Sequence, residues 1–341
     1  MYSSSNISTV LIGGLGIGYK PNDYLLPKFS VEAHAGELIA LVGRNGVGKS
    51  TLLRTIMGLQ APFEGRVDIF GKSASSLLRK ERSRLLSFVP ADTVKIPNLY
   101  IRDFVALSRF PYTGWSRTLA AADWDMVDKS LLQVGINHLS YRDITTVSDG
   151  ERQRAMIAFA LAQDAKIILL DEPTAYLDLP NKYEVVHLLS QLAHSRNKTI
   201  IYSTHDLQGA ISEADNIWMM LDTGFVAGAP EDIALSNGFN QFLANTNMMF
   251  DTSLGLFKNQ RNPQKFIAIE GQGDALLWTK RLAERLGFAC VERSNAEIMV
   301  SCSKTDNGSL WEVYQKNTLA RKVHSLTELG QLFKGLHKLK P

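Results

Sequence analysis

One segment of this sequence combines glycines, a lysine and a hydroxyl residue at a spacing suited to a phosphate ligand. Glycines let consecutive backbone N–H groups turn inward around phosphates, and the N-terminus of a following helix adds positive potential. Lys49 is expected to reach the β- and γ-phosphates of ATP, and the Ser50 hydroxyl to contact Mg²⁺. The segment fits the pattern G-x-x-x-x-G-K-[ST], and with Thr51 it supplies the predicted nucleotide-binding residues Gly43, Arg44, Asn45, Gly46, Val47, Gly48, Lys49, Ser50 and Thr51.

Two adjacent carboxylates could complete the chemistry of hydrolysis. Asp171 and Glu172 directly follow the apolar run of residues 166–170. A magnesium-nucleotide site needs a carboxylate for the ion and a group that orients and deprotonates water. We therefore expect Asp171 to hold Mg²⁺ through water and Glu172 to act as the general base.

Three apolar runs must position these residues. Residues 38–42, 166–170 and 199–203 read as buried strands, and each ends in polar side chains, the last at His205. Strands alternate with helical stretches over residues 7–236, a pattern typical of an α/β domain with a largely parallel sheet. Ligands bind at the carboxyl edge of such sheets. Between the first two runs, residues 74–165 read as mostly helical.

The segment before the second run reads Val147-Ser148-Asp149-Gly150-Glu151-Arg152-Gln153-Arg154. It resembles the signature of ABC ATPases, usually written LSGGQ followed by Gln and Arg. Three further elements resemble that family: residues 171–174 as the extended Walker B motif, residues 175–178 as the D-loop, and His205 as the switch histidine. The resemblance covers residues 7–236 and implies a mostly parallel core, an antiparallel N-terminal subdomain and a helical subdomain near residues 92–163. Residues 98–105 and 109–112 resemble importers of iron–siderophore complexes, haem or cobalamin.

The resemblance implies a head-to-tail dimer of two copies. Each ATP is then enclosed by the P-loop of one copy and by Ser148 and Gly150 of the other. His205 is implied to hydrogen-bond the γ-phosphate and the attacking water, alongside Lys49 and Glu172. Tyr19 stands where family members stack an aromatic ring on adenine, although a strand-end aromatic that covers the core is an alternative.

Residues 91–115 correspond to the family's contact with the coupling helix of a permease. The residues assigned to this contact are Ala91, Tyr100, Arg109 and Tyr112, with Lys95, Phe110 and Trp115 nearby; packing inside the helical subdomain is the alternative. Ala91 stands where the family has a glutamine that touches Mg²⁺ and relays the nucleotide state. Because alanine can do neither, either water or the neighbouring Asp92 completes the coordination or the coupling differs. Our hypothesis is that hydrolysis persists with altered coupling, because Asp171, Glu172 and His205 are intact.

The signature also departs from the family pattern. Asp149 replaces a glycine, and a carboxylate aimed at the γ-phosphate would repel it, so we expect Asp149 to point away and cap the following helix. We expect at least one of Arg152 and Arg154 to be a solvated helix charge.

A second, smaller domain follows residues 7–236, the predicted ATP-binding cassette. Residues 237–263, rich in Asn, Gln and Gly, read as a connector, and residues 264–341 read as a compact α+β unit. A helical stripe from Ala275 ends at Gly287, strands follow, and Ser325 with Glu328 predicts a capping box for a last helix. The residues show no catalytic set. The domain is expected to be structural or dimerising, with binding of a regulator as the alternative.

Composition narrows the functional class. The 341 residues hold 37 basic and 34 acidic side chains, a net charge of +3, which is too mild for a dedicated nucleic-acid surface. No run approaches the ~18 apolar residues of a membrane span, and the first residues do not resemble a signal peptide. Cys290 and Cys302 suggest reduced thiols. We expect a cytosolic ATPase attached to the inner membrane through a permease that works with a substrate-binding protein. The alternatives are an importer of another substrate, a soluble ABC ATPase acting on DNA or ribosomes, and a regulatory ATP-binding module without turnover.

Overall fold

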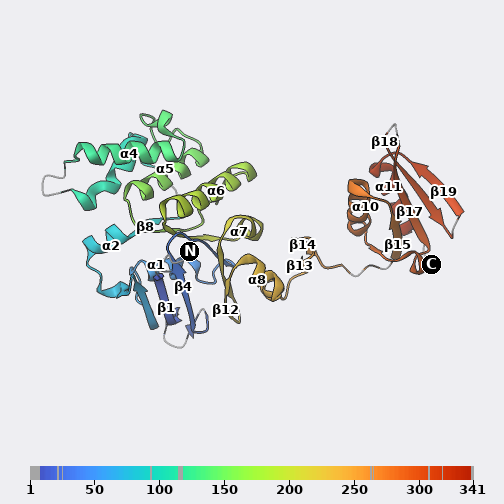
Figure 1. Cartoon of the computed structure of the whole chain (residues 1–341), viewed down its shortest axis with the longest axis horizontal. Coiled ribbons are helices and arrows are strands. Elements are labelled where there is room, and N and C mark those ends of the chain that lie inside the picture. Colours follow the sequence, from blue (N-terminus) through green and yellow to red (C-terminus); the bar gives the residue numbers. More distant parts are fainter. Residues whose placement is uncertain are drawn as a thin grey trace, which may run out of the picture. The chain divides into compact units, whose positions relative to one another are not determined.

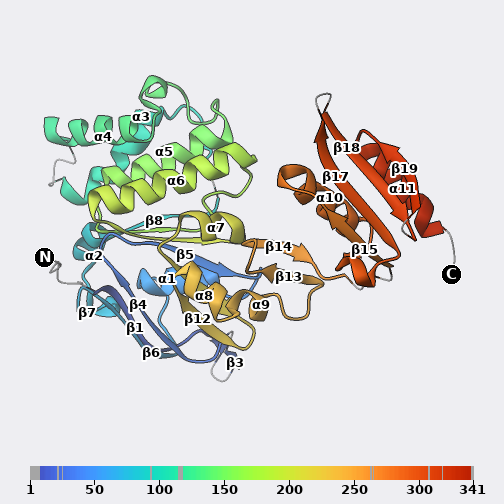
Figure 2. The ribbon, with the colours of Figure 1, turned by 45° about the vertical axis from the view of Figure 1, so that its right-hand side comes forward.

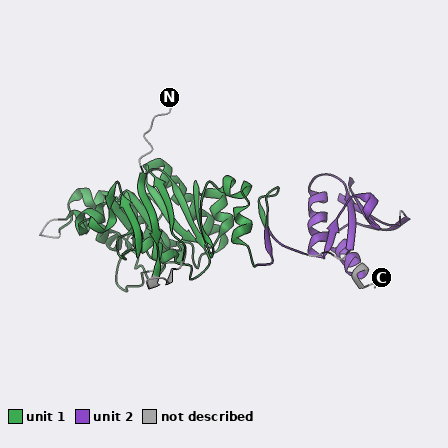
Figure 3. Cartoon of the chain, turned by 90° about the horizontal axis from the view of Figure 1, so that it is seen from below, with its two compact units in different colours: residues 1–245, 250–257 green, residues 246–249, 258–341 purple. Residues whose placement is uncertain are grey.

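The computed structural model describes residues 8–20, 23–24, 26–92, 94–113, 118–261, 263, 265–305, 308–316 and 318–338. The chain forms two compact units, which Figure 3 colours separately. Unit 1 comprises residues 1–245 and 250–257, and unit 2 comprises residues 246–249 and 258–341. Among the described residues, every helix is too short or too polar to span a bilayer.

A six-stranded sheet forms the centre of unit 1. Its strands are β5 (Leu38–Gly43), β8 (Leu86–Val89), β9 (Ile167–Leu170), β10 (Thr199–Thr204), β11 (Asn216–Leu221) and β12 (Gly224–Gly228). The spatial order is β12-β11-β5-β10-β9-β8, and all neighbours are parallel except the edge strand β12. Parallel strands covered on both faces are apolar throughout. In β5, for example, every residue is buried.

The two faces of this sheet are covered by different layers (Figures 1 and 2). Leu38, Ala40 and Val42 point into one core cluster, whereas Ile39 and Leu41 point into the other. On the second face lies α1 (Lys49–Ile56) and an antiparallel sheet in the order β4-β1-β6-β7. Its strands are β1 (Ser8–Gly16), β4 (Phe29–His34), β6 (Glu64–Ile69) and β7 (Lys72–Ser73), and a separate pair comprises β2 (Gly18–Lys20) and β3 (Asp23–Tyr24). This arrangement confirms the predicted parallel core and antiparallel N-terminal subdomain.

Helices cover the first face. Between β8 and β9 the chain forms α3 (Ile101–Ala106), α4 (Ala121–Gln133) and α5 (Asp149–Ala162), with short 3-10 turns η2 (Leu107–Tyr112) and η3 (Asn137–Leu139). Further elements of unit 1 are η1 (Ala74–Ser76), α2 (Arg79–Leu85), α6 (Leu179–Arg196), α7 (Leu207–Glu213) and α8 (Pro230–Leu235). The prediction of a mostly helical segment over residues 74–165 missed β8. This strand has only four residues, and its pairing with β9 is visible only in the fold.

Residues 237–263 are more than a connector. They form α9 (Gly238–Phe242), β13 (Met248–Asp251) and β14 (Leu256–Asn259), and the two strands pair. The rings of Phe239, Phe250 and Phe257 pack against one another in tilted and edge-to-face contacts, with centroid separations of 4.8, 5.9 and 5.0 Å, as part of the core of unit 1. The cassette therefore extends about twenty residues beyond the predicted boundary at residue 236, because these rings complete its core.

Unit 2 is a five-stranded sheet with two helices. Its elements are β15 (Lys265–Glu270), α10 (Gly273–Arg285), β16 (Phe288–Cys290), η4 (Arg293–Asn295), β17 (Ile298–Thr305), β18 (Gly308–Gln315), β19 (Thr318–Val323) and α11 (Leu326–Lys338). The strand order is β16-β15-β17-β18-β19. Side chains from both helices and the sheet share one apolar core, which confirms the predicted α+β architecture. Ser325 Oγ accepts a hydrogen bond from Glu328 N–H at 3.2 Å at the start of the last helix.

Candidate functional site

The phosphate loop lies between β5 and α1, at the carboxyl edge of the parallel sheet. Gly46 and Gly48 have φ angles of 82° and 110°, a backbone region that glycine adopts without a Cβ clash. A Cβ on Gly43 would lie 2.6 Å from Val47 Cγ1. The loop therefore requires glycine at all three positions, and its backbone can approach a ligand closely.

Lys49 is buried at the start of α1. Its side chain is 5% exposed, and its Nζ donates a hydrogen bond to the Gly43 carbonyl at 2.9 Å. The same Nζ lies 3.5 Å from Glu172 Oε1. The ammonium group is thus held over the loop, next to the carboxylate of Glu172, which follows β9.

Other predicted loop residues are more open. Asn45 and Gly46 are exposed, and Ser50 and Thr51 are half-buried on the first turn of α1. Arg44 reaches away from the loop, because its guanidinium pairs with Asp222 at 3.3 Å and donates to the Ala244 carbonyl at 2.9 Å. The loop is thereby connected to the segment that follows α9.

The two carboxylates after β9 lie in different surroundings. Asp171 is 6% exposed and accepts a hydrogen bond from Ser203 Oγ at 2.7 Å. Glu172 has a φ angle of 46°, unusual for a residue with a side chain, and its side chain is 28% exposed. Glu172 Oε2 lies 3.9 Å from Nδ1 of His205, whose side chain is 60% exposed.

The fold brings the predicted catalytic residues together. Lys49, Glu172 and His205 come from the ends of three different segments, and the Glu172 carboxylate stands between the other two. This cluster contains a cation for phosphate, a half-exposed carboxylate for water and a histidine open to a ligand. Such a set can hold a phosphoanhydride and activate water beside it.

The signature segment forms the N-terminus of α5. Ser148 is the N-cap: its hydroxyl and N–H donate to Glu151 Oε2, both at 2.8 Å, and Glu151 N–H donates back to Ser148 Oγ at 3.3 Å. These bonds to Ser148 lower the pKa of the Glu151 carboxyl group. The prediction that Asp149 caps this helix is wrong, because Ser148 has that role. Gly150 is buried, and a Cβ there would lie 3.2 Å from Asn181 Oδ1.

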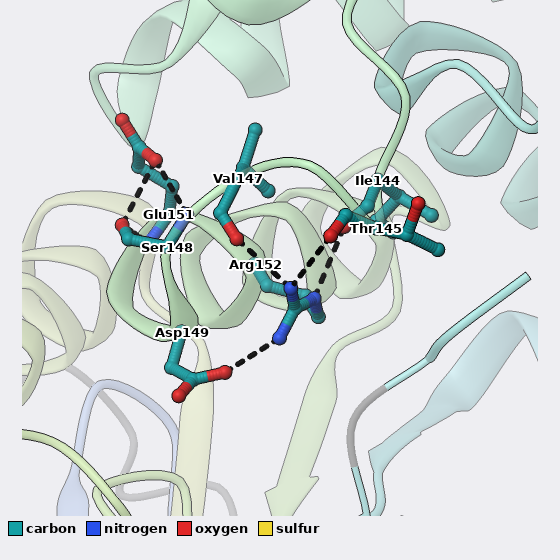
Figure 4. Close-up of polar contacts among 7 residues, drawn as sticks. All are labelled: Ile144, Thr145, Val147, Ser148, Asp149, Glu151 and Arg152. Atoms are coloured by element: carbon teal, nitrogen blue, oxygen red, sulfur yellow. Dashed lines mark hydrogen bonds and ion pairs between the residues drawn. The ribbon is translucent and has the colours of Figure 1, made fainter. Parts of the chain in front are cut away.

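Arg152 neutralises the unusual acidic residue of the signature (Figure 4). Its guanidinium contacts Asp149 Oδ1 at 2.5 Å and donates to the carbonyls of Ile144 and Val147 at 3.0 and 2.8 Å. The Arg152 side chain is only 7% exposed, whereas that of Asp149 is 58% exposed. Arg154 is also engaged, with Glu184 and the Val134 carbonyl. The expectation of a solvated helix charge is therefore wrong for both arginines.

Two residues of the predicted permease contact face inward. Arg109 is 8% exposed; it pairs with Asp123 at 3.0 Å, donates to the Ala162 carbonyl at 2.7 Å and lies over the Tyr112 ring at 4.0 Å. Tyr112 donates to the Gln163 carbonyl at 3.0 Å. Both side chains join η2 to α5, so we remove Arg109 and Tyr112 from the predicted contact surface. Tyr100 is 50% exposed and Ala91 is half-buried.

Some predicted residues lie outside the described part of the chain, namely the Tyr19 side chain and Trp115. In the described part, no hydrogen bond or ion pair joins the signature segment to the phosphate loop of the same copy. Ser203 is a site residue that the sequence did not predict, and its Oγ bonds the Asp171 carboxylate and the backbone N–H of Glu172. Its only signal was its position at the end of an apolar run, two residues before His205.

Comparisons with known proteins agree with this geometry. A family model described as ABC transporter matches residues 26–175, and one described as iron ABC transporter C-terminal domain matches residues 264–334. An uncharacterized ABC transporter ATP-binding protein of Methanocaldococcus jannaschii is 34% identical over 252 residues, which cover 74% of this chain and 87% of the relative. A petrobactin import ATP-binding protein of Bacillus anthracis is 36% identical, covering 61% of this chain and 77% of the relative. Among solved structures, a dimeric post-hydrolysis ATP-binding cassette bound to ADP and phosphate is 27% identical with a TM-score of 0.57, covering 65% of this chain and 98% of that one.

Proposed function

The chain belongs to the family of ABC transporter ATP-binding proteins, and from this premise we propose that it powers the import of an iron–siderophore, haem or cobalamin-type chelate. The chain is an ATPase. The observation that carries the proposed hydrolysis is the contact of the Glu172 carboxylate with both Lys49 and His205. Two similarities support the imported cargo. A relative carries the name of a petrobactin import protein, and residues 264–334 match an iron transporter domain.

The residues present fit a magnesium-nucleotide complex. Gly46 and Gly48 open the loop for phosphates, and Lys49 supplies a positive charge there. Ser50 and Asp171 would hold Mg²⁺, which when bound neutralises charge on the phosphates. Asp171 suits this role because it is a buried carboxylate, and within the described part of the chain its one side-chain hydrogen bond comes from Ser203 to Oδ1. Glu172 takes the proton from water, and His205 orients the water and the γ-phosphate.

A second copy completes the nucleotide site in this proposal. Ser148 and Gly150 at the N-terminus of α5 would offer N–H groups and a favourable helix dipole to the γ-phosphate, and the Ser148 hydroxyl would join them by exchanging its bond to Glu151 for one to the phosphate. They would meet the nucleotide of the partner copy in a head-to-tail dimer. The dimeric state of the related cassette supports this arrangement. Tyr19 is proposed to stack on the adenine.

Membrane attachment would come through separate permease subunits on the cytoplasmic side of the inner membrane. A substrate-binding protein would deliver the chelate to that permease. Tyr100, exposed at the start of α3, and Ala91, after β8, are the residues that we propose for the contact. Because Ala91 replaces the family's glutamine, the coupling would differ while hydrolysis persists.

Replacing the general base tests the proposal. Glu172→Gln keeps the shape of the side chain but cannot accept a proton, so we expect ATP turnover to fall by about 10²- to 10⁴-fold. The measurement is phosphate release by the full chain with its membrane partner. Glu213→Gln is the matched control, because Glu213 also lies beside a histidine, His187, and its side chain is 25% exposed. If Glu172→Gln turned over ATP at the wild-type rate, the proposed site would be wrong.

A further inference from the structure

One buried hydroxyl contacts both carboxylate residues of the site. Ser203 is 0% exposed on β10. Its Oγ donates a hydrogen bond to Asp171 Oδ1 at 2.7 Å and accepts one from the backbone N–H of Glu172 at 2.8 Å. The two bonds connect Ser203 to Asp171, which is proposed to hold the metal ion, and to Glu172, which is proposed to deprotonate water.

The direction of these bonds is determined by chemistry. An amide N–H can only donate, so the Ser203 oxygen must accept from Glu172. The single hydroxyl proton is then available for Asp171, whose ionised carboxylate can only accept. This bond engages Oδ1 of Asp171, whereas no hydrogen bond from the residues that the structure describes engages Oδ2, which leaves that oxygen to meet a cation.

The same hydroxyl supports an unusual turn of the backbone. The parallel pairing of β9 with β10 ends at Leu170 and Tyr202, one residue before Asp171 and Ser203. Glu172 then adopts a φ angle of 46°, a left-handed conformation that persists in non-glycine residues only where neighbours hold it. Beyond the end of this strand pairing, the Ser203 hydroxyl accepts the hydrogen bond from the Glu172 N–H. It thereby holds the turn that places the Glu172 carboxylate beside Lys49 and His205.

We propose that Ser203 is a positioning residue for ATP hydrolysis, which orients the Asp171 carboxylate toward the metal ion and the Glu172 carboxylate toward water. The inference rests on the proposed roles of Asp171 and Glu172. Ser203 touches neither nucleotide nor water in this scheme and acts only through its two neighbours.

The test compares Ser203→Ala with a matched variant, Ser87→Ala, in the full chain. Ser87 is 1% exposed on the nearby strand β8 and donates to Gln163 Oε1 at 2.8 Å, so its loss also removes a buried hydroxyl contact. We expect Ser203→Ala to lower kcat by about 10- to 100-fold, because small misplacements of catalytic groups have effects of that size. The KM for ATP should change by less than about threefold, because the P-loop contacts are retained. Mn²⁺ binding to the ATP-loaded protein, measured by electron paramagnetic resonance, should weaken severalfold.

A purely structural role predicts a different pattern. In that case both variants would lose similar thermal stability and leave kcat and Mn²⁺ affinity unchanged, which would overturn the proposal. Should Ser203→Ala fail to fold, Ser203→Cys gives the same test, since a thiol has similar size but donates weakly; wild-type kcat in that variant would refute the assignment. Glu172→Gln is measured alongside. If Glu172→Gln slows turnover and Ser203→Ala does not, only this inference fails, whereas wild-type turnover by Glu172→Gln refutes the proposed function itself.

Discussion

At the residue scale, the signature segment contains an acidic residue, Asp149, and an arginine, Arg152, that neutralises it. Asp149 would place a negative charge where the proposed γ-phosphate binds, yet its carboxylate is paired with Arg152 at 2.5 Å (Figure 4). Arg152 also binds the carbonyls of Ile144 and Val147, so the guanidinium holds the whole approach to α5. Arginine suits this role because its planar fork serves several acceptors at once.

We therefore expect opposite results from the two members of this pair. Asp149→Asn should change ATP-driven dimerisation little, because the carboxylate is already neutralised. Arg152→Met should weaken dimerisation, since Asp149 then faces the γ-phosphate unpaired, and it should lower the free energy of unfolding by about 1–3 kcal/mol because buried carbonyls lose their donor. Dimerisation is measured by sedimentation of Glu172→Gln protein with ATP, and stability by thermal unfolding.

A combined variant separates charge from structure. In Asp149→Asn/Arg152→Met protein the effect on dimerisation should be smaller than in Arg152→Met alone, because no unpaired carboxylate remains. A large gain in dimerisation from Asp149→Gly would show instead that Asp149 does repel the nucleotide.

At the element scale, charged pairs join the helices between β8 and β9. Arg102 on α3 makes two hydrogen bonds with Asp128 on α4, at 2.7 and 2.9 Å, and lies over the Trp124 ring at 4.3 Å. Arg109 on η2 pairs with Asp123, which also lies on α4. These contacts orient α3 and η2, and the buried apolar residues of α3 share a core cluster with those of α5.

The Arg102–Asp128 pair predicts a pH-dependent contribution to stability. The hydrogen bond and charge of Arg102 lower the pKa of Asp128 in the folded chain, so this contribution is present above about pH 4 and is lost as pH falls through the lowered pKa. Asp128→Asn should reduce the free energy of unfolding at pH 7 by no more than about 1 kcal/mol, because the carboxylate is half exposed. Thermal unfolding from pH 7 to pH 3 should show the two proteins converging. Asp125→Asn on the same helix is the control, and an equal effect there would contradict the prediction.

At the scale of the whole molecule, unit 1 extends beyond residue 236, to residues 250–257. The aromatic cluster of Phe239, Phe250 and Phe257 belongs to the core of unit 1. The Arg44 guanidinium in the phosphate loop also binds the Ala244 carbonyl. A truncation at residue 236 would remove these parts of the cassette together with unit 2.

Two truncations should therefore behave differently. A chain ending at residue 263 should keep the thermal stability of the cassette, whereas a chain ending at residue 236 should lose at least the 3–5 kcal/mol that is typical of deleting one buried phenylalanine. Thermal unfolding and ATP binding measure both. Equal stability of the two chains would show that residues 237–263 are only a connector.

The chain that ends at residue 263 also tests the role of unit 2. We propose a structural or dimerising role, for which removal of residues 264–341 should weaken dimerisation in sedimentation experiments. Unchanged dimerisation with lost inhibition by the transported substrate would favour the regulatory alternative.

By itself, the sequence determined the family and the fold class, and it predicted the residues that we propose for the nucleotide site. These features are local: the glycines of the phosphate loop are needed for backbone angles at their own positions, and apolar runs ending in Asp171 or His205 identify strand ends at one sheet edge. The helical stripe and capping residues of unit 2 were likewise readable from short spacings.

Only the tertiary structure decided which side chains are free and which are committed. The Ala162 carbonyl lies 53 residues from Arg109, and the partners of Ser203 lie 31 and 32 residues away in the chain. The segment β8 is a strand because it pairs with β9. Arg152 lies only a few residues from its acceptors, but its burial depends on the surrounding helices. Burial and long-range hydrogen bonds arise when distant segments pack together, and no local spacing specifies them.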